Sequence, residues 1–158
     1  MSGAMEPGTI GWDWFSLYWP DGSSLMAFQL RRAGKKSYLA GTHIAANGVV
    51  TKLSGEEISL TPLEQWTSRR GVKYPIKWQL GISKLGLNLE VNAIINGQVM
   101  EPEQVQTIES LAGSKTNSQL SQSKLPSEYW EGAIEDQKHS VKGYLEMTGY
   151  ERPIGEMM

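Results

Sequence analysis

The sequence predicts an all-β protein whose strands form an antiparallel barrel. Three observations lead to this fold class. Short segments alternate between apolar and polar residues, turn signals recur about every eight to twelve residues, and helical segments do not alternate with strands. About nine or ten short strands result, which is typical of antiparallel sandwiches and barrels.

Composition limits the classes of function. The chain has 158 residues, of which 39% are hydrophobic and 20% are charged, so it can form one domain with a sizeable core. The formal net charge is −2 and no basic block occurs, which argues against nucleic acid or an anionic membrane as a partner. No stretch has the length of a transmembrane helix, and the absence of cysteine excludes disulfide and thiol chemistry.

The most aromatic segment, residues 11–19, is predicted to be a strand. It holds three tryptophans, a tyrosine and a phenylalanine, and a Pro-Asp-Gly turn at 20–22 ends it. The period-two alternation of a strand places Trp12, Trp14, Ser16 and Tyr18 on one face and Asp13, Phe15, Leu17 and Trp19 on the other. Because both faces are largely apolar, we expect that other parts of the protein cover both of them, or that the strand belongs to a barrel wall and its side chains line the interior.

Further strands follow in hairpin order, at residues 24–32, 37–45, 49–53 and 57–63. Asn47-Gly48 is the strongest short hairpin signal, because both residues tolerate the positive φ angles of a type I′ turn. Pro62 interrupts a weak pattern, so the strand at 57–63 is expected to be an edge or bulged strand.

The two clearest strands are expected at residues 74–82 and 87–93. Each alternates cleanly, with apolar side chains at Tyr74, Ile76, Trp78, Leu80 and Ile82 in the first and at Leu87, Leu89, Val91 and Ala93 in the second. One buried face and one wet face per strand are typical of an antiparallel sheet over a core. Asn96-Gly97 then predicts a further tight turn.

Residues 101–127 are polar and lack aromatic residues, so we expect a short helix at 103–111 and a mobile loop at 113–123. Strand character returns at 128–135 and 141–150. The meander of hairpins favours a lipocalin-like (calycin-type) barrel with a polar loop or short helix before the last two strands, and an interior that holds one small apolar ligand. Residues 11–150 would form this domain, after a cloning remnant and linker at 1–10 and before a frayed tail at 151–158.

Acidic residues beside aromatic residues are the best candidates for a site. A carboxylic acid whose pKa is raised by burial among aromatic rings can donate a proton to an alkene, and aromatic faces stabilise a carbocation. The candidate acids are Asp13, Glu131 and Glu146. The candidate ligand-binding residues are Trp12, Trp14, Tyr18, His43, Trp78, Trp130, Tyr144 and Tyr150. The structural alternative is that the aromatic residues form core and rim while the acids make surface or inter-strand hydrogen bonds.

Other catalytic or metal-binding patterns are absent from the sequence. His43 and His139 lie far apart, and neither has metal-ligand spacing, so we expect His43 to be structural or to line the barrel and His139 to be solvated. No Gly-x-Ser-x-Gly or phosphate-binding glycine loop occurs. The sequence therefore predicts no metal, no cofactor and no serine hydrolase.

Five segments resemble the AttH / carotenoid 1,2-hydratase-like family, in the family's order and approximate spacing. They are Gly-Trp-Asp-Trp-Phe-Ser-Leu at 11–17, Ser-Leu-Thr-Pro-Leu at 59–63, Tyr-Pro-Ile-Lys-Trp at 74–78, Tyr-Trp-Glu-Gly-Ala at 129–133 and Gly-Tyr-Leu-Glu-Met-Thr-Gly-Tyr at 143–150. The resemblance implies a protein of two lipocalin-like barrels, of which this chain is similar to the C-terminal one. It implies an N-terminal partner barrel if the chain is a fragment. Family members usually carry a Met-Asp-His-Glu-Trp-like stretch before the first segment, where this chain has Glu-Pro-Gly-Thr at 6–9.

The expected function is therefore that of a lipocalin-like domain which binds an apolar small molecule in or at the mouth of its barrel. The alternative, implied by the resemblance, is an enzyme or half of one: a hydratase (carbon–oxygen lyase) or a cyclase acting on an isoprenoid-like or polyketide-like substrate. Homo-oligomers are expected where a face built to be covered lacks its partner. Export to the periplasm is expected only if the full-length protein carries a signal peptide.

Overall fold

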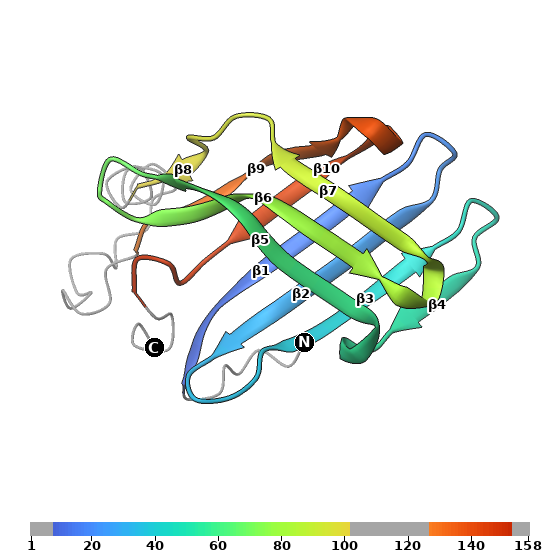
Figure 1. Ribbon diagram of the computed structural model, residues 1–158, viewed down its shortest axis with the longest axis horizontal. Helices are drawn as coiled ribbons and strands as arrows, with labels where there is room; N and C mark the ends of the chain where they lie inside the picture. Colours follow the sequence, from blue (N-terminus) through green and yellow to red (C-terminus); the bar gives the residue numbers. More distant parts are fainter. Residues whose placement is uncertain (1–7, 102–126, 153–158) are drawn as a thin grey trace, which may run out of the picture.

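A computed structural model describes residues 8–101 and 127–152, which form a single antiparallel sheet (Figure 1). Its strands are β1 (Thr9–Tyr18), β2 (Ser24–Arg32), β3 (Tyr38–Ile44), β4 (Val50–Leu53), β5 (Ile58–Thr67), β6 (Lys73–Ile82), β7 (Leu87–Ala93), β8 (Val99–Met100), β9 (Tyr129–Asp136) and β10 (Val141–Met147). Three single-turn 3-10 helices connect strands: η1 (Gly55–Glu57), η2 (Ser83–Leu85) and η5 (Gln137–His139). The prediction of an all-β, antiparallel fold is confirmed.

The sheet curls strongly, so that β5, β6 and β7 lie in front of β1, β2 and β10 (Figure 1). The strand order is β4-β3-β2-β1-β10-β9-β7-β6-β5, and the short β8 pairs with β9 outside this path. The first and last long strands are neighbours, with Phe15 opposite Leu145. This half-barrel, with β4 and β5 as its edge strands, agrees with the expected lipocalin-like barrel.

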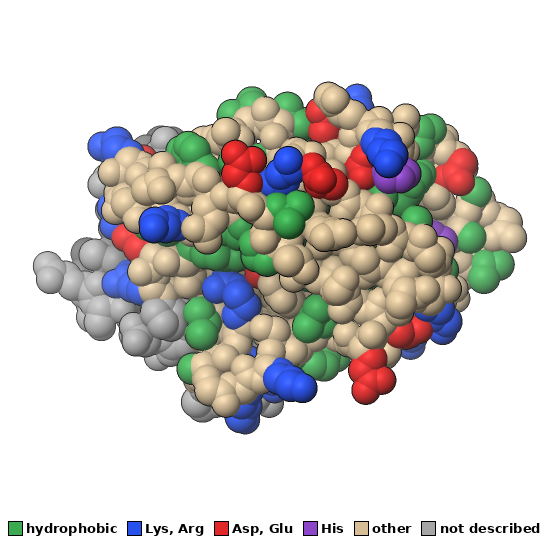
Figure 2. Space-filling model, in the orientation of Figure 1, with side chains coloured by type: hydrophobic (Ala, Val, Ile, Leu, Met, Phe, Trp, Pro, Cys, Tyr) green, Lys and Arg blue, Asp and Glu red, His purple; other side chains and the backbone are tan. Residues whose placement is uncertain are grey.

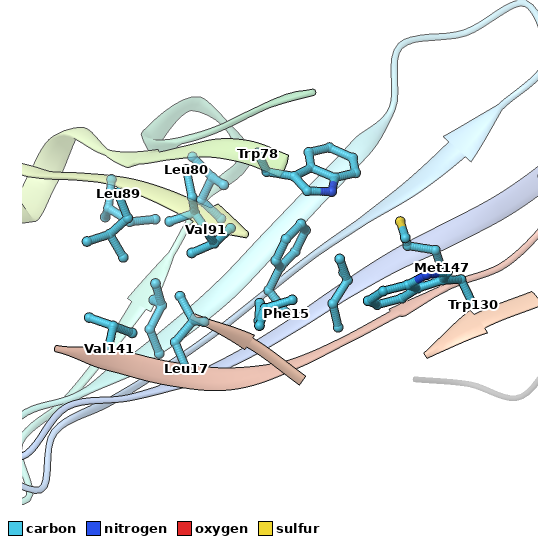
Figure 3. Close-up of a cluster of buried hydrophobic side chains, with 14 of the residues drawn as sticks. Phe15, Leu17, Trp78, Leu80, Leu89, Val91, Trp130, Val141 and Met147 are labelled. Carbon is cyan, nitrogen blue, oxygen red and sulfur yellow. The ribbon is translucent and has the colours of Figure 1, made fainter. Parts of the chain in front are cut away.

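The concave side of the sheet is filled by apolar side chains (Figure 3). Phe15 and Leu17 of β1 point inward with Trp78 and Trp130, and all four side chains are almost completely buried. The rings of Phe15 and Trp78 meet edge to face at 5.2 Å. Each buried indole donates to a backbone carbonyl, Trp78 Nε1 to Pro75 O at 3.1 Å and Trp130 Nε1 to Asn96 O at 2.7 Å. The two tryptophans are therefore satisfied parts of the core.

The outward side of β6 and β7 is polar, as their alternation predicts. The side chains of Lys77 and Glu90 form an ion pair of 2.9 Å there, and Gln79 donates to Asn88 at 3.0 Å. Figure 2 shows this side of the molecule, with charged side chains spread over it and hydrophobic side chains in separate small groups. The expected inward residues of β6 are all buried. The one-sided burial of these two strands is thus confirmed.

The hairpin between β3 and β4 differs in detail from the prediction. Gly48 has a φ of +89°, but the φ of Asn47 is not positive, because Ser140 alone among the described non-glycine residues has a positive φ. The prediction of a type I′ turn is therefore wrong. Gly48 N donates to Ala45 O at 2.8 Å, and the Asn47 side chain accepts from Val49 N at 3.1 Å. The hairpin itself is present, but its loop is longer than two residues and is closed by the hydrogen bond from Ala45 N to Val49 O at 2.9 Å, with Gly48 as its left-handed residue.

Most strand boundaries lie within a residue or two of those expected, with two exceptions. β10 ends at Met147, before the predicted end at residue 150, and Gly149 beyond it has a positive φ. β5 continues to Thr67, beyond the predicted end at residue 63, because its pairing with β6 resumes after a register shift between Pro62 and Glu64. The prediction of an edge strand with a bulge at Pro62 is confirmed. The helix expected at 103–111, the loop at 113–123 and the tail beyond 152 lie outside the described residues.

Candidate functional site

The predicted site residues divide between the two sides of the sheet. Asp13 and Tyr150 meet inside the barrel, and Trp78 and Trp130 lie in its core. His43 lies on β3, where its ring faces the ring of Trp19 at 6.4 Å. The remaining six residues follow the outward side of β1, β9 and β10: Trp12, Trp14, Tyr18, Glu131, Tyr144 and Glu146. Trp12 and Trp14 thus flank Asp13 in sequence but lie on the opposite side of the strand from it.

Asp13 is the centre of a buried polar cluster, and its carboxyl group is completely shielded from solvent. Its Oδ2 accepts from Gln29 Nε2 at 2.8 Å and Arg31 Nε at 3.1 Å, and its Oδ1 accepts from the Tyr150 hydroxyl at 2.6 Å. Burial raises the pKa of Asp13, and the charge of Arg31 and the hydrogen bonds from Tyr150 and Gln29 offset only part of that effect. Both oxygens are therefore occupied by donors of the protein itself.

Aromatic rings continue from this cluster along the inside of the barrel. The Arg31 guanidinium lies 4.0 Å above the Tyr150 ring, which in turn lies 5.3 Å from the ring of Tyr74. Trp66 stacks on Tyr74 at 6.5 Å. Burial, followed by the charge of Asp13, raises the pKa of Tyr150, so its hydroxyl stays a hydrogen-bond donor at neutral pH. We call the three rings of Trp66, Tyr74 and Tyr150 the aromatic ladder.

Two polar groups, the Tyr74 hydroxyl and the Glu128 carboxylate, are buried beside the aromatic ladder. Among the described residues, neither the hydroxyl nor either carboxylate oxygen makes a hydrogen bond of good geometry, although the hydroxyl and the carboxylate lie close to each other. Burial, followed by the charge of Glu128 and a hydrogen bond to its carboxylate, raises the pKa of Tyr74, so the hydroxyl remains protonated. The Arg70 guanidinium is 3.9 Å from Glu128 and also pairs with Glu151. A buried acceptor and a buried hydroxyl thus lie together beside the aromatic ladder.

The outward side of β2, β1, β10 and β9 carries a second cluster. Trp14 stacks on Phe28 at 6.0 Å and lies directly opposite Glu146, which lies opposite Glu131 on the next strand. Trp12 Nε1 donates to Glu146 Oε1 at 3.1 Å. We call this the outer aromatic surface, and it consists of Trp12, Trp14, Phe28, Tyr38 and Tyr144 with the acids Glu131 and Glu146.

A groove of about 760 Å³ lies beside η5 and the outward side of β7, with mixed polar and apolar lining that includes Asn88, Glu90 and His139. Asp136 accepts from Glu90 N at 3.0 Å and from His139 N at 3.1 Å, and its Oδ2 lies 2.9 Å from His139 Nδ1. Although burial alone would raise it, these hydrogen bonds lower the pKa of Asp136. The carboxylate therefore caps η5 and joins it to β7.

Sequence reasoning missed four residues of the buried cluster as parts of a site: Gln29, Arg31, Tyr74 and Glu128. Gln29 and Arg31 follow Leu25 and Ala27 at period two, so the inward face of β2 was a usable signal for them. Glu128 precedes the inward-facing Trp130 by two positions in the same way. Polar residues at inward positions of a strand are thus the signal that could have located this cluster.

No group of three or more His, Asp or Glu side chains is arranged to hold a metal ion within residues 8–101 and 127–152. Across the same ranges the structure has no helix with the length and hydropathy to cross a membrane.

Comparisons with known proteins agree with the geometry. A search of the curated proteins finds no match. The solved structure of a protein from Nitrosomonas europaea described as an AttH superimposes with a TM-score of 0.72 and 25% sequence identity. The match covers 94% of this chain but 41% of that one, so the chain spans less than half the length of that relative. The AttH-like family itself matches residues 1–150, and the chain therefore belongs to the AttH-like family.

Proposed function

We propose that this AttH-like domain binds a small, largely apolar molecule at the end of its barrel, with a hydroxyl group of that molecule held between Tyr74 and Glu128. The observation that carries the proposal is the pair of buried polar groups beside the aromatic ladder, whose capacity for well-formed hydrogen bonds the protein leaves unfilled. Leaving a buried acceptor unsatisfied costs about 1–3 kcal/mol, so such groups in a native protein call for a partner.

The chemistry of the two groups defines the polar end of the ligand. The Glu128 carboxylate is an acceptor, whereas the Tyr74 hydroxyl, with its raised pKa, can donate. A ligand hydroxyl donates to the first and accepts from the second, so it satisfies both at once. An anionic end group would instead lie against the Glu128 carboxylate itself, which cannot donate a hydrogen bond to it and would repel it.

The side chains around Tyr74 and Glu128 suit the apolar part of the ligand. The rings of the aromatic ladder offer flat surfaces, and the neighbouring Val72 and Ile76 are buried apolar side chains. Aromatic walls with a small number of directed polar groups are the usual composition of a small-molecule site. The same end of the barrel thus supplies apolar contact and orientation.

Acid catalysis of hydration or cyclisation is the second candidate, favoured by the raised pKa of Asp13. Two observations weigh towards binding instead. Both oxygens of Asp13 already accept hydrogen bonds from the protein, and Glu131 and Glu146 lie outside the barrel. General acid catalysis requires that the acid reach the reacting atom.

Retinol, an apolar isoprenoid alcohol whose fluorescence rises on binding, is a suitable probe. We expect the chain to bind retinol and the variants Y74F and E128Q to bind it at least tenfold more weakly, because each variant removes one hydrogen bond to the hydroxyl. Fluorescence titration measures the dissociation constants. The hydrocarbon analogue of retinol, which lacks the hydroxyl, should bind the wild type and both variants alike.

Matched controls are Y38F and E135Q, which make the same changes at half-exposed or exposed positions outside the barrel. Both should bind retinol as the wild type does. Retinol affinity that is unchanged in Y74F and E128Q would contradict the proposal and indicate that a buried water satisfies these groups. Turnover of an isoprenoid alkene that is lost in D13N while binding persists would support the second candidate.

A further inference from the structure

The outer aromatic surface leaves large rings in contact with solvent. Trp14 is 41% exposed, Tyr38 is 51% exposed and Tyr144 is 46% exposed, and they belong to β1, β3 and β10, with Phe28 of β2 between Tyr38 and Trp14. Rings of this size gathered on one face are typical of a surface that another protein covers.

The opposite wall of the same sheet provides the comparison. On the outward side of β6 and β7 the corresponding positions hold Lys77, Gln79, Asn88 and Glu90, joined by an ion pair and a side-chain hydrogen bond. The outward side of β6 and β7 is thus suited to contact with solvent, whereas the wall of β2, β1 and β10 carries aromatic residues on both of its sides. Burial of the inward rings accounts for one side only, so the outward rings need a separate explanation.

Two carboxylates lie beside the exposed rings. Glu146 and Glu131 are directly opposite each other on β10 and β9, and no ion pair to either is found in the part of the chain that the structure describes. Like charges at directly opposite positions destabilise a sheet. A cation placed over this pair would remove the repulsion, and neighbouring Trp14 and Tyr144 would add cation–π contacts.

We infer that the outer aromatic surface is the docking face for the remaining half of a two-part AttH-type protein, and that this partner places a lysine or arginine over Glu131 and Glu146. The matched relative has well over half of its length outside the region shared with this chain, so a partner of that kind exists in the family. A second copy of this chain fits less well, since an isologous dimer brings like patches, and hence like carboxylates, together. The inference does not depend on the ligand proposed above.

Hydroxyl-radical footprinting tests the inference on the polypeptide that the native host makes, compared with the 158-residue chain alone. We expect Trp14, Tyr38 and Tyr144 to be oxidised at least fivefold more slowly in the host protein than in the chain. Leu63, which is exposed on β5, should react equally in both. A host polypeptide no longer than this chain, or rings that react equally in both samples, would overturn the inference.

Charge variants of the host protein test the predicted cation. E131Q/E146Q, which keeps the side-chain shape, should weaken docking and raise the oxidation of Trp14 at least threefold, and E131K/E146K should raise it further. The control E56K/E64K reverses two exposed acids elsewhere and should have no effect. Circular dichroism of each variant in the isolated chain confirms folding. Protection of Trp14 in a dimer of the isolated chain, or protection that is unchanged in E131Q/E146Q, would refute the assignment.

Discussion

At the scale of single residues, the Asp13–Arg31 pair shows how the fold tolerates a buried charge. Arg31 donates to Asp13, packs on the Tyr150 ring and donates a hydrogen bond to the carbonyl oxygen of Thr148. The pair therefore links β1 and β2 to the segment that follows β10. The net contribution of the pair to the free energy of folding depends on the cost of burying the two charges as much as on their mutual attraction.

Replacing both partners of this pair should cost less than the sum of the costs of replacing each one alone. We expect D13N to lower the free energy of unfolding by about 2–3 kcal/mol, since it leaves the Arg31 charge, which is 20% exposed, without its counter-charge. The double variant D13N/R31M should be less destabilised than the sum of D13N and R31M by about 1 kcal/mol or more. Urea denaturation of the four proteins gives the coupling energy, and strictly additive effects would show that the two side chains do not interact.

Asp136 should make stability depend on pH. Its pKa is lowered in the folded state, so its contribution is complete above the ordinary value of 3.8 and is lost as the pH falls through that value towards the folded pKa. We expect D136N to lose about 1–2 kcal/mol at pH 7 and a smaller amount at pH 3, because the contribution of the ionised carboxylate declines as the pH falls below 3.8. Urea denaturation at pH 7, 5 and 3 measures this. A loss that is the same at all three values, or equal to that of the neighbouring control E135Q, would contradict the assignment.

At the scale of secondary-structure elements, the contact between β1 and β10 depends on a small residue. An added Cβ at Gly143 would lie 2.0 Å from Ser16 O and 2.8 Å from Leu17 Cδ2. The backbone oxygen cannot move without breaking the pairing of the two strands, so no side chain fits. Gly143 therefore fixes how closely the first and last long strands approach.

The variant G143A should destabilise the protein by about 1–3 kcal/mol through overpacking. The matched control is G81A on β6, where an added Cβ would meet the Ser59 hydroxyl oxygen at 2.7 Å, and that side chain can rotate away. We expect its cost to be clearly smaller. Thermal denaturation of both variants makes the comparison, and equal losses would show that strand geometry, rather than close approach at Gly143, sets the effect.

At the scale of the whole molecule, the sheet has two unlike walls. The wall of β6 and β7 buries one side and presents the other to water, whereas the wall of β2, β1 and β10 carries aromatic side chains inward and outward. A curled sheet can fill its own concave side but leaves its convex side uncovered. This asymmetry is what a domain from a larger assembly is expected to show, in agreement with the coverage of its relative.

The sequence by itself determined the fold class, most strand positions and the family, because alternation and turn residues act over a few neighbouring positions. It could also sort the residues of a strand into two sets, as it did for Asp13 and Phe15 against Trp12 and Trp14. It could not decide which set lies inside when both are apolar. Nor could it bring Asp13 to Tyr150, or Glu131 opposite Glu146, since these contacts depend on which strands pair and in which register. Only the tertiary structure decided them. The register of β9 against β10 sets which acids are opposite each other, and closure of the sheet joins Asp13 to Tyr150 although the chain separates them by 137 positions.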